Sequence, residues 1–140
     1  MSAERLAVGW TVWLRTILAA VAANLVLRAA ALLVFDIPPA FEPLATAAPT
    51  VFLTTVGVAL GLGVAVAVNG SSAQPVRLYQ RIVLVALLVS LVPDLWMLTG
   101  SGREAYPDAT LPAVITLMVQ HVAAAAIVLR GVTGRVGWTS

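Results

Sequence analysis

The sequence predicts an all-α integral membrane protein, a four-helix antiparallel bundle with both termini cytoplasmic. Of its residues, 61% are hydrophobic and 10% are charged, whereas a soluble domain carries about 25% charged residues. Four apolar stretches of about twenty residues recur along the chain. Because an α-helix rises about 1.5 Å per residue, each stretch can cross the roughly 30 Å hydrocarbon core of a bilayer. We expect a single four-span transmembrane domain covering residues 1–140.

The first span is expected over residues 13–36 and contains Asn24 and Arg28, one helical turn apart. It should end near Asp36, since prolines follow at positions 38 and 39 and the residue before a proline is pushed out of the helical region. An arginine at the centre of a membrane helix costs about 2.5 to 3.5 kcal/mol on insertion scales, so its side chain should face protein or water.

The second span is expected over residues 49–68 and opens with a proline, which suits the first turn of a helix. Three glycines on it, Gly57, Gly61 and Gly63, have the small-residue spacing that lets a neighbouring helix approach closely in lipid. We expect these glycines to serve packing within the chain, with homodimerisation as the less favoured alternative.

The third and fourth spans carry the remaining polar groups of the membrane region. The third, over residues 80–99, contains Pro93 and Asp94, and a kink is expected one turn earlier, near Ser90, because the proline cannot donate a backbone hydrogen bond. The fourth, over residues 111–130, carries Gln120 and His121 at its middle.

The arginines predict the orientation. All eight basic residues are arginines. The side with the termini and the 69–81 loop has Arg5, Arg15, Arg77, Arg81, Arg130 and Arg135, and the opposite side has Arg103. By the positive-inside rule, both termini face the cytoplasm and the protein is a multi-pass protein of the cytoplasmic (inner) membrane. The lipid bilayer is its first partner, and the scattered arginines form no patch for nucleic acid.

The depths of the polar side chains in the membrane predict that they contact one another. Counted along their helices, Arg28 and Asp94 both lie about 18 Å from the cytoplasmic ends, so we expect them to form an ion pair. The expected cluster is Asn24, Arg28, Ser90, Asp94, Gln120 and His121. Three interpretations stay open: a structural lock between helices, a pocket open to the outer face, or an Arg28 side chain that extends outward to Asp36 or the surface.

Catalytic chemistry has little support in the sequence. The chain has no cysteine and one histidine, which excludes thiol chemistry. A metal site would have only His121 and Asp94 to draw on, and a haem would have only Met97 as a remote second ligand. Ser90, His121 and Asp94 could be imagined as a triad, but no activated-serine turn or oxyanion loop accompanies them. No catalytic residue, metal site or cofactor is predicted.

The order of these features resembles small four-helix membrane proteins of bacteria, frequent in actinobacteria, that form a domain of unknown function. The residues that carry the resemblance are Asn24 with Arg28, Pro49 with Gly57, the run Ser90-Leu91-Val92-Pro93, and Met118 with His121. The resemblance implies the four-span topology and no activity.

Three classes of function follow. The first is a non-enzymatic accessory or scaffold subunit that packs against itself, as a homo-oligomer, or against a larger membrane complex. The second is a module that binds or transports a small ligand, an ion or a lipid headgroup at the polar cluster. The third, a membrane enzyme or redox subunit using His121, is disfavoured by the missing cysteines and the lone histidine.

Overall fold

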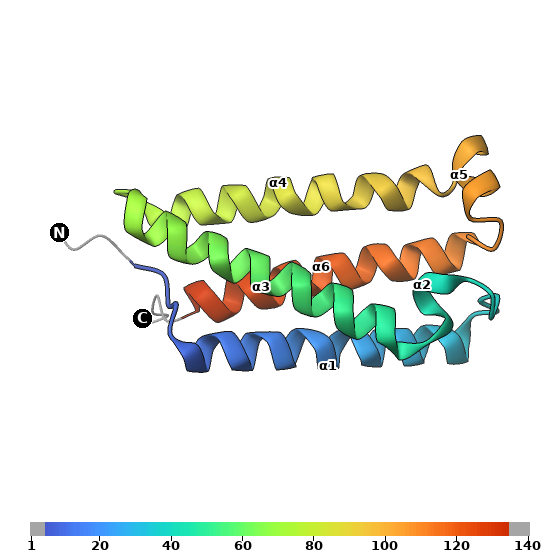
Figure 1. Ribbon diagram of the computed structural model, residues 1–140, viewed down its shortest axis with the longest axis horizontal. Coiled ribbons are helices and arrows are strands. Elements are labelled where there is room, and N and C mark those ends of the chain that lie inside the picture. Colours follow the sequence, from blue (N-terminus) through green and yellow to red (C-terminus); the bar gives the residue numbers. More distant parts are fainter. Residues whose placement is uncertain (1–4, 135–140) are drawn as a thin grey trace.

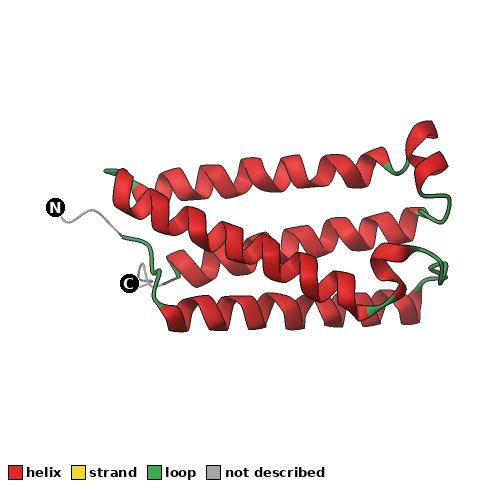
Figure 2. Ribbon diagram, viewed as in Figure 1, coloured by secondary structure: helices red, strands yellow, loops and turns green. Residues whose placement is uncertain are grey.

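The computed structural model describes residues 5–134, which form helices and loops with no strand among them. The long helices are α1 (Trp10–Val34), α3 (Ala47–Ser71), α4 (Pro75–Trp96) and α6 (Leu111–Thr133), and the short ones are α2 (Glu42–Ala45) and α5 (Gly100–Ala105). The long helices run in alternating directions along one axis and are joined by short connections (Figures 1 and 2). The predicted all-α four-helix architecture is confirmed.

Each long helix is long and apolar enough to cross a membrane. The shortest has 22 residues and therefore extends about 33 Å, slightly more than the hydrocarbon core of a bilayer. Large apolar side chains cover the outside of the bundle; Leu33, for example, is 87% exposed. Such a surface is a liability in water and suits contact with lipid.

Several helix ends differ from those expected. Helix α4 begins at Pro75, inside the segment 69–81 that was expected to be a loop, because proline fits the first turn of a helix, where no backbone donor is needed. Helix α3 continues to Ser71, whose hydroxyl donates to the Ala67 carbonyl at 2.8 Å. Helices α2 and α5 lie inside segments expected to be loops. Arg135, counted above for orientation, lies outside the described residues.

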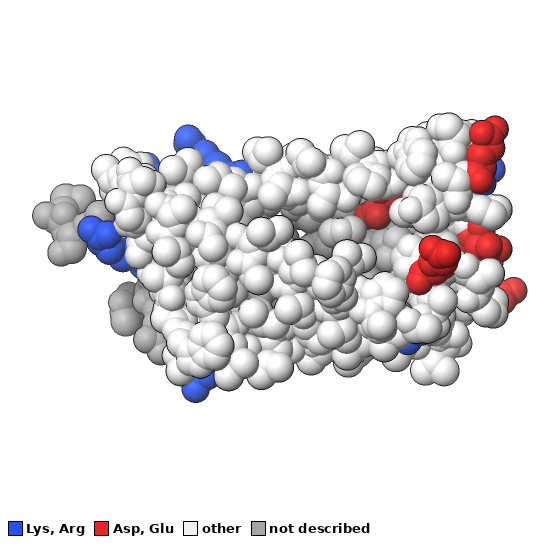
Figure 3. Space-filling model, viewed as in Figure 1, with Lys and Arg blue, Asp and Glu red and all other residues white. Residues whose placement is uncertain are grey.

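Charged residues gather at the two ends of the bundle. One end, where α1 begins and α6 ends, is basic, and the opposite end is mainly acidic (Figure 3). We call them the basic end, with Arg5, Arg15, Arg77, Arg81 and Arg130, and the acidic end, with Asp36, Glu42, Glu104, Asp108 and also Arg103.

Helix α6 contacts all three other long helices, and α3 packs against both α1 and α4. A tight contact between α1 and α6 involves a glycine that was not predicted: a Cβ atom added at Gly131 would overlap the Thr16 side chain. Thr16 is buried and, being β-branched, has few alternative rotamers. Gly131 therefore sets how closely α1 and α6 pack.

The three predicted packing glycines behave differently from one another. Gly61 lies near Tyr79 of α4, whose hydroxyl donates to the Gly61 carbonyl at 3.0 Å. A Cβ atom added at Gly57 or Gly63 would have no neighbour within 4 Å. The expectation that all three serve packing inside the chain is therefore corrected: only Gly61 has a close neighbour among the described residues.

The buried core is divided by a polar layer. One apolar cluster, around Leu62, Tyr79 and Val128, lies toward the basic end, and a second, around Phe41 and Val114, lies toward the acidic end. The buried polar residues that fall between them along the helices are Asn24, Thr50, Thr54, Asp94, Thr116 and Gln120. Polar side chains from all four long helices thus share one level of the bundle.

Candidate functional site

A cleft opens at the level of the polar layer. Helix α3 runs obliquely, from beside α4 at the basic end toward α1 at the acidic end (Figure 1). A hollow of about 360 Å³ lies between α3, α4 and α6, and a second of about 330 Å³ adjoins it toward the basic end. Gly57, Ser90 and His121 line both. Figure 3 shows the molecule hollowed on this face, so the cleft opens sideways, where lipid would be.

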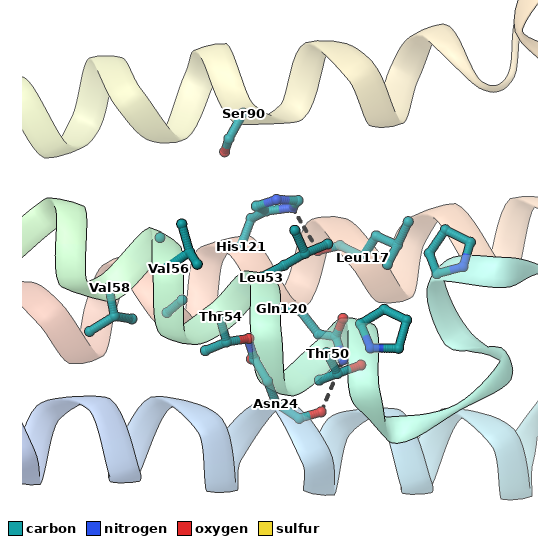
Figure 4. Close-up of a pocket in the computed structure, with 14 residues that line it drawn as sticks. Asn24, Thr50, Leu53, Thr54, Val56, Val58, Ser90, Leu117, Gln120 and His121 are labelled. Atoms are coloured by element: carbon teal, nitrogen blue, oxygen red, sulfur yellow. Dashed lines mark hydrogen bonds between the residues drawn. The ribbon is translucent and has the colours of Figure 1, made fainter.

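Three polar residues connect α1, α3 and α6 along one wall of the cleft (Figure 4). The Asn24 amide nitrogen donates to the Thr54 hydroxyl at 2.9 Å. The Gln120 amide nitrogen donates to the backbone carbonyl of Asn24, also at 2.9 Å. All three side chains are buried. Because alternative partners are scarce in a membrane interior, these bonds fix the positions of the three helices relative to one another.

Two buried polar atoms in the same wall have no hydrogen-bond partner: Oδ1 of Asn24 and the hydroxyl oxygen of Thr50. Thr55, Thr116 and Thr133 each donate to the carbonyl four residues earlier, at 2.6 to 2.8 Å, as helical threonines commonly do. Thr50 makes no such bond. Each unsatisfied buried group lowers the free energy of unfolding by about 1–3 kcal/mol. Both residues line the larger hollow.

The His121 ring contacts two oxygens. Its Nδ1 atom lies 3.0 Å from Oδ2 of Asp94 and 3.0 Å from the Leu117 carbonyl oxygen. One ring N–H cannot point straight at both oxygens. The geometry favours Leu117, which leaves Oδ2 of Asp94 in contact with the ring but without a directed hydrogen bond. Asp94 is therefore a buried carboxylate whose nearby counter-group is His121, and this contact joins α4 to α6.

Ser90 completes the residues considered for a triad. It points from α4 toward His121 across the cleft (Figure 4), but its hydroxyl donates to the Leu87 carbonyl at 2.7 Å. The hydroxyl is thus engaged by its own helix, and no hydrogen bond joins it to His121 in the described part of the chain. The arrangement is an aspartate–histidine pair beside a serine, without the serine–histidine bond that activates a nucleophile.

The predicted ion pair between Arg28 and Asp94 is wrong. The Arg28 guanidinium donates to the Leu44 carbonyl from Nε at 3.0 Å and to the Ala45 carbonyl from Nη2 at 3.1 Å. These are the last carbonyls of α2, which have no partner within that helix and attract a cation. Arg28 thus extends outward, as one interpretation anticipated, although it reaches α2 and not Asp36.

The structure therefore separates the six expected residues into groups. Asn24 and Gln120 meet at one wall of the cleft, Asp94 contacts His121, Ser90 lines both hollows, and Arg28 donates to the carbonyls of α2. Sequence reasoning missed Thr50 and Thr54, although their spacing of four residues places both on one helix face. Within residues 5–134, no three His, Cys, Asp or Glu side chains gather where they could hold a metal ion.

One comparison with known proteins gives a match. A family described as a family of unknown function (DUF6069) matches residues 4–137, nearly the whole chain. No curated protein and no solved structure matches.

Proposed function

The chain belongs to DUF6069, a family of unknown function, and we propose that it is a non-enzymatic membrane protein that binds a small amphiphilic molecule in the cleft between α3 and α4. The observation that carries this proposal is the hollow of about 360 Å³, which opens sideways and has apolar walls around a few polar side chains. Ligand sites generally have this composition and measure about 300–1,000 Å³.

The proposed binding can be tested by filling the cleft. Gly57 lines both hollows and has open space where a Cβ would stand, whereas Gly63 has similar space but lines neither. We expect a photoactivatable analogue of 1-octanol to label cleft residues saturably in the unmodified protein and in Gly63→Phe, and to lose this labelling in Gly57→Phe. Labelling that never saturates, or that Gly57→Phe leaves unchanged, would contradict the proposal.

An accessory or scaffold subunit is the second candidate function. It is supported by the exposed position of Gly63 on α3, where no neighbour lies within 4 Å and a helix of a second copy or of a larger complex can approach closely. If the protein self-associates there, Gly63→Leu should convert an oligomer in mild detergent to a monomer, as measured by light scattering. A monomeric mass for the unmodified protein would contradict self-association.

We further propose that the basic end faces the cytoplasm, in the cytoplasmic membrane of a bacterium. The support is the separation of charge between the two ends, which the positive-inside rule relates to orientation. The chain has no cysteine of its own, so single cysteines can report each side. In intact cells, a membrane-impermeant maleimide should label Ala105→Cys and spare Ser71→Cys; the reverse pattern would invert the topology.

A further inference from the structure

The unpartnered atoms in the cleft indicate what kind of molecule it binds. Resting on the proposed function, we infer that the cleft recognises an alcohol: an uncharged hydroxyl group that bonds to Asn24 and Thr50, attached to a hydrocarbon chain. Thr50 lies one helical turn before Thr54, which accepts the Asn24 amide N–H, so the free hydroxyl and the free amide oxygen belong to the same part of the wall (Figure 4).

Asn24 requires the ligand to supply a hydrogen-bond donor. Its amide nitrogen is already bonded to Thr54, and the atom left without a partner is Oδ1, which can only accept. The Thr50 hydroxyl can either donate or accept, and it has neither partner. Both residues are more than nine-tenths buried. A ligand hydroxyl can donate to the amide oxygen and accept from the threonine, which an ether or an ester oxygen cannot do.

The absence of a free charge in the lining excludes an ionic head. Two ionisable residues line the hollows in the described part of the chain: His121, whose ring Asp94 already contacts, and Tyr79, a phenol whose hydroxyl donates to the Gly61 carbonyl. Arg28, which could otherwise bind an anion, donates to the carbonyls of α2. A carboxylate, phosphate or ammonium group at this depth would lack a counter-charge, which is strongly unfavourable in a medium of low polarity.

The second hollow supplies the space for a hydrocarbon chain. It continues from the shared residue Gly57 toward the basic end and is lined mainly by apolar side chains, among them Val64, Ile82 and Leu87. A hydroxyl at Asn24 therefore leaves room for an apolar chain along α3 and α4. A free alcohol and a lipid with an unesterified hydroxyl, such as a diacylglycerol, share this chemistry.

The test is competition against the photoactivatable octanol in nanodiscs, with competitors matched by their concentration in the bilayer. In the unmodified protein, 1-octanol should compete about five-fold better than methyl octyl ether, which has the same chain but no donor. Thr50→Val keeps the shape of the side chain but removes the hydroxyl that donates to the ligand oxygen, so it should weaken competition by 1-octanol about five-fold. Thr55→Val, on the same helix but outside both linings, should leave competition by 1-octanol unchanged.

The outcomes separate this inference from the proposed function. If labelling of the cleft saturates but the ether competes as well as the alcohol, or Thr50→Val leaves competition by 1-octanol unchanged, the inference is overturned, because water alone then satisfies the free atoms. If no labelling of the cleft saturates, the proposed function itself fails. Adding 1,2-dioctanoylglycerol as a competitor distinguishes the two sources: competition stronger than that of 1-octanol supports a lipid, and weaker competition supports a small free alcohol.

Discussion

The contact between Asp94 and His121 predicts an asymmetric response to mutation. Asp94 is buried, with 4% of its side chain exposed, and His121 provides the nearby counter-group. Replacing His121 with glutamine leaves the carboxylate buried and uncompensated. Breaking a fully buried pair costs about 3–5 kcal/mol. Because the His121 side chain is 41% exposed, the pair is only partly enclosed by protein, and we expect the free energy of unfolding to fall by about 1–3 kcal/mol.

Removing the carboxylate as well should restore most of this loss. Asp94→Asn replaces the charged group with a neutral one of the same shape, so it should cost less than about 1 kcal/mol alone and should nearly abolish the effect of His121→Gln. The measurement is a double-mutant cycle of unfolding in mixed micelles, followed by circular dichroism. We expect a coupling energy of at least about 1 kcal/mol between the two positions.

A parallel cycle supplies the control. Arg28 lies with α2 and makes no contact with Asp94, so the effects of Arg28→Gln and Asp94→Asn should add within about 0.5 kcal/mol. If His121→Gln is equally destabilising with Asp94 or Asn at position 94, the carboxylate and the ring do not interact and the account of the α4–α6 contact is wrong. A measured coupling energy between positions 28 and 94 would instead indicate that Arg28 and Asp94 form the ion pair expected from their depth.

Three further predictions concern single positions. Arg28→Gln should lower the free energy of unfolding by about 1–2 kcal/mol, because two charge-assisted hydrogen bonds to α2 are lost, and hydrogen exchange of the α2 amides should accelerate. Gly131→Leu should lower the free energy of unfolding by about 1–3 kcal/mol, because the new side chain overlaps Thr16. Gly63→Leu, in open space, should change the stability of the monomer by less than about 0.5 kcal/mol. Thr50→Val should raise the free energy of unfolding by up to about 1 kcal/mol, because it removes a buried hydroxyl that has no partner. All four variants can be compared in the same micelle assay.

The number and nature of the long helices could be predicted because they depend on apolar length alone. A stretch such as residues 16–35, which has few polar side chains, has one stable conformation in a bilayer, where every backbone polar group must be bonded internally. Helix ends were less predictable because they depend on local bonds. The extension of α3 to Ser71 and the short helices α2 and α5 are examples.

The error at Arg28 has a specific physical cause. The rise per residue gives the depth of a side chain but not the direction in which its helix is rotated, and α1 is apolar on nearly every side, so no hydrophobic stripe fixes that direction. The carbonyls that bind Arg28 come from α2, inside a segment assigned to a loop. Asp94 was correctly expected to need a partner, and His121 is the residue that reaches it.

The position of the cleft follows from the distribution of large side chains. Toward the basic end, Val58 and Leu62 of α3 pack in one cluster with Tyr79 and Val83 of α4. The apolar cluster toward the acidic end contains residues from α1, α2, α6 and the loops, with Met97 directly after α4, but none from α3 among those described. There α3 is held by the bond between Asn24 and Thr54 and by its packing on α1. Helix α3 is thus drawn toward α4 at one end and toward α1 at the other, so the opening between α3 and α4 is a consequence of the packing itself.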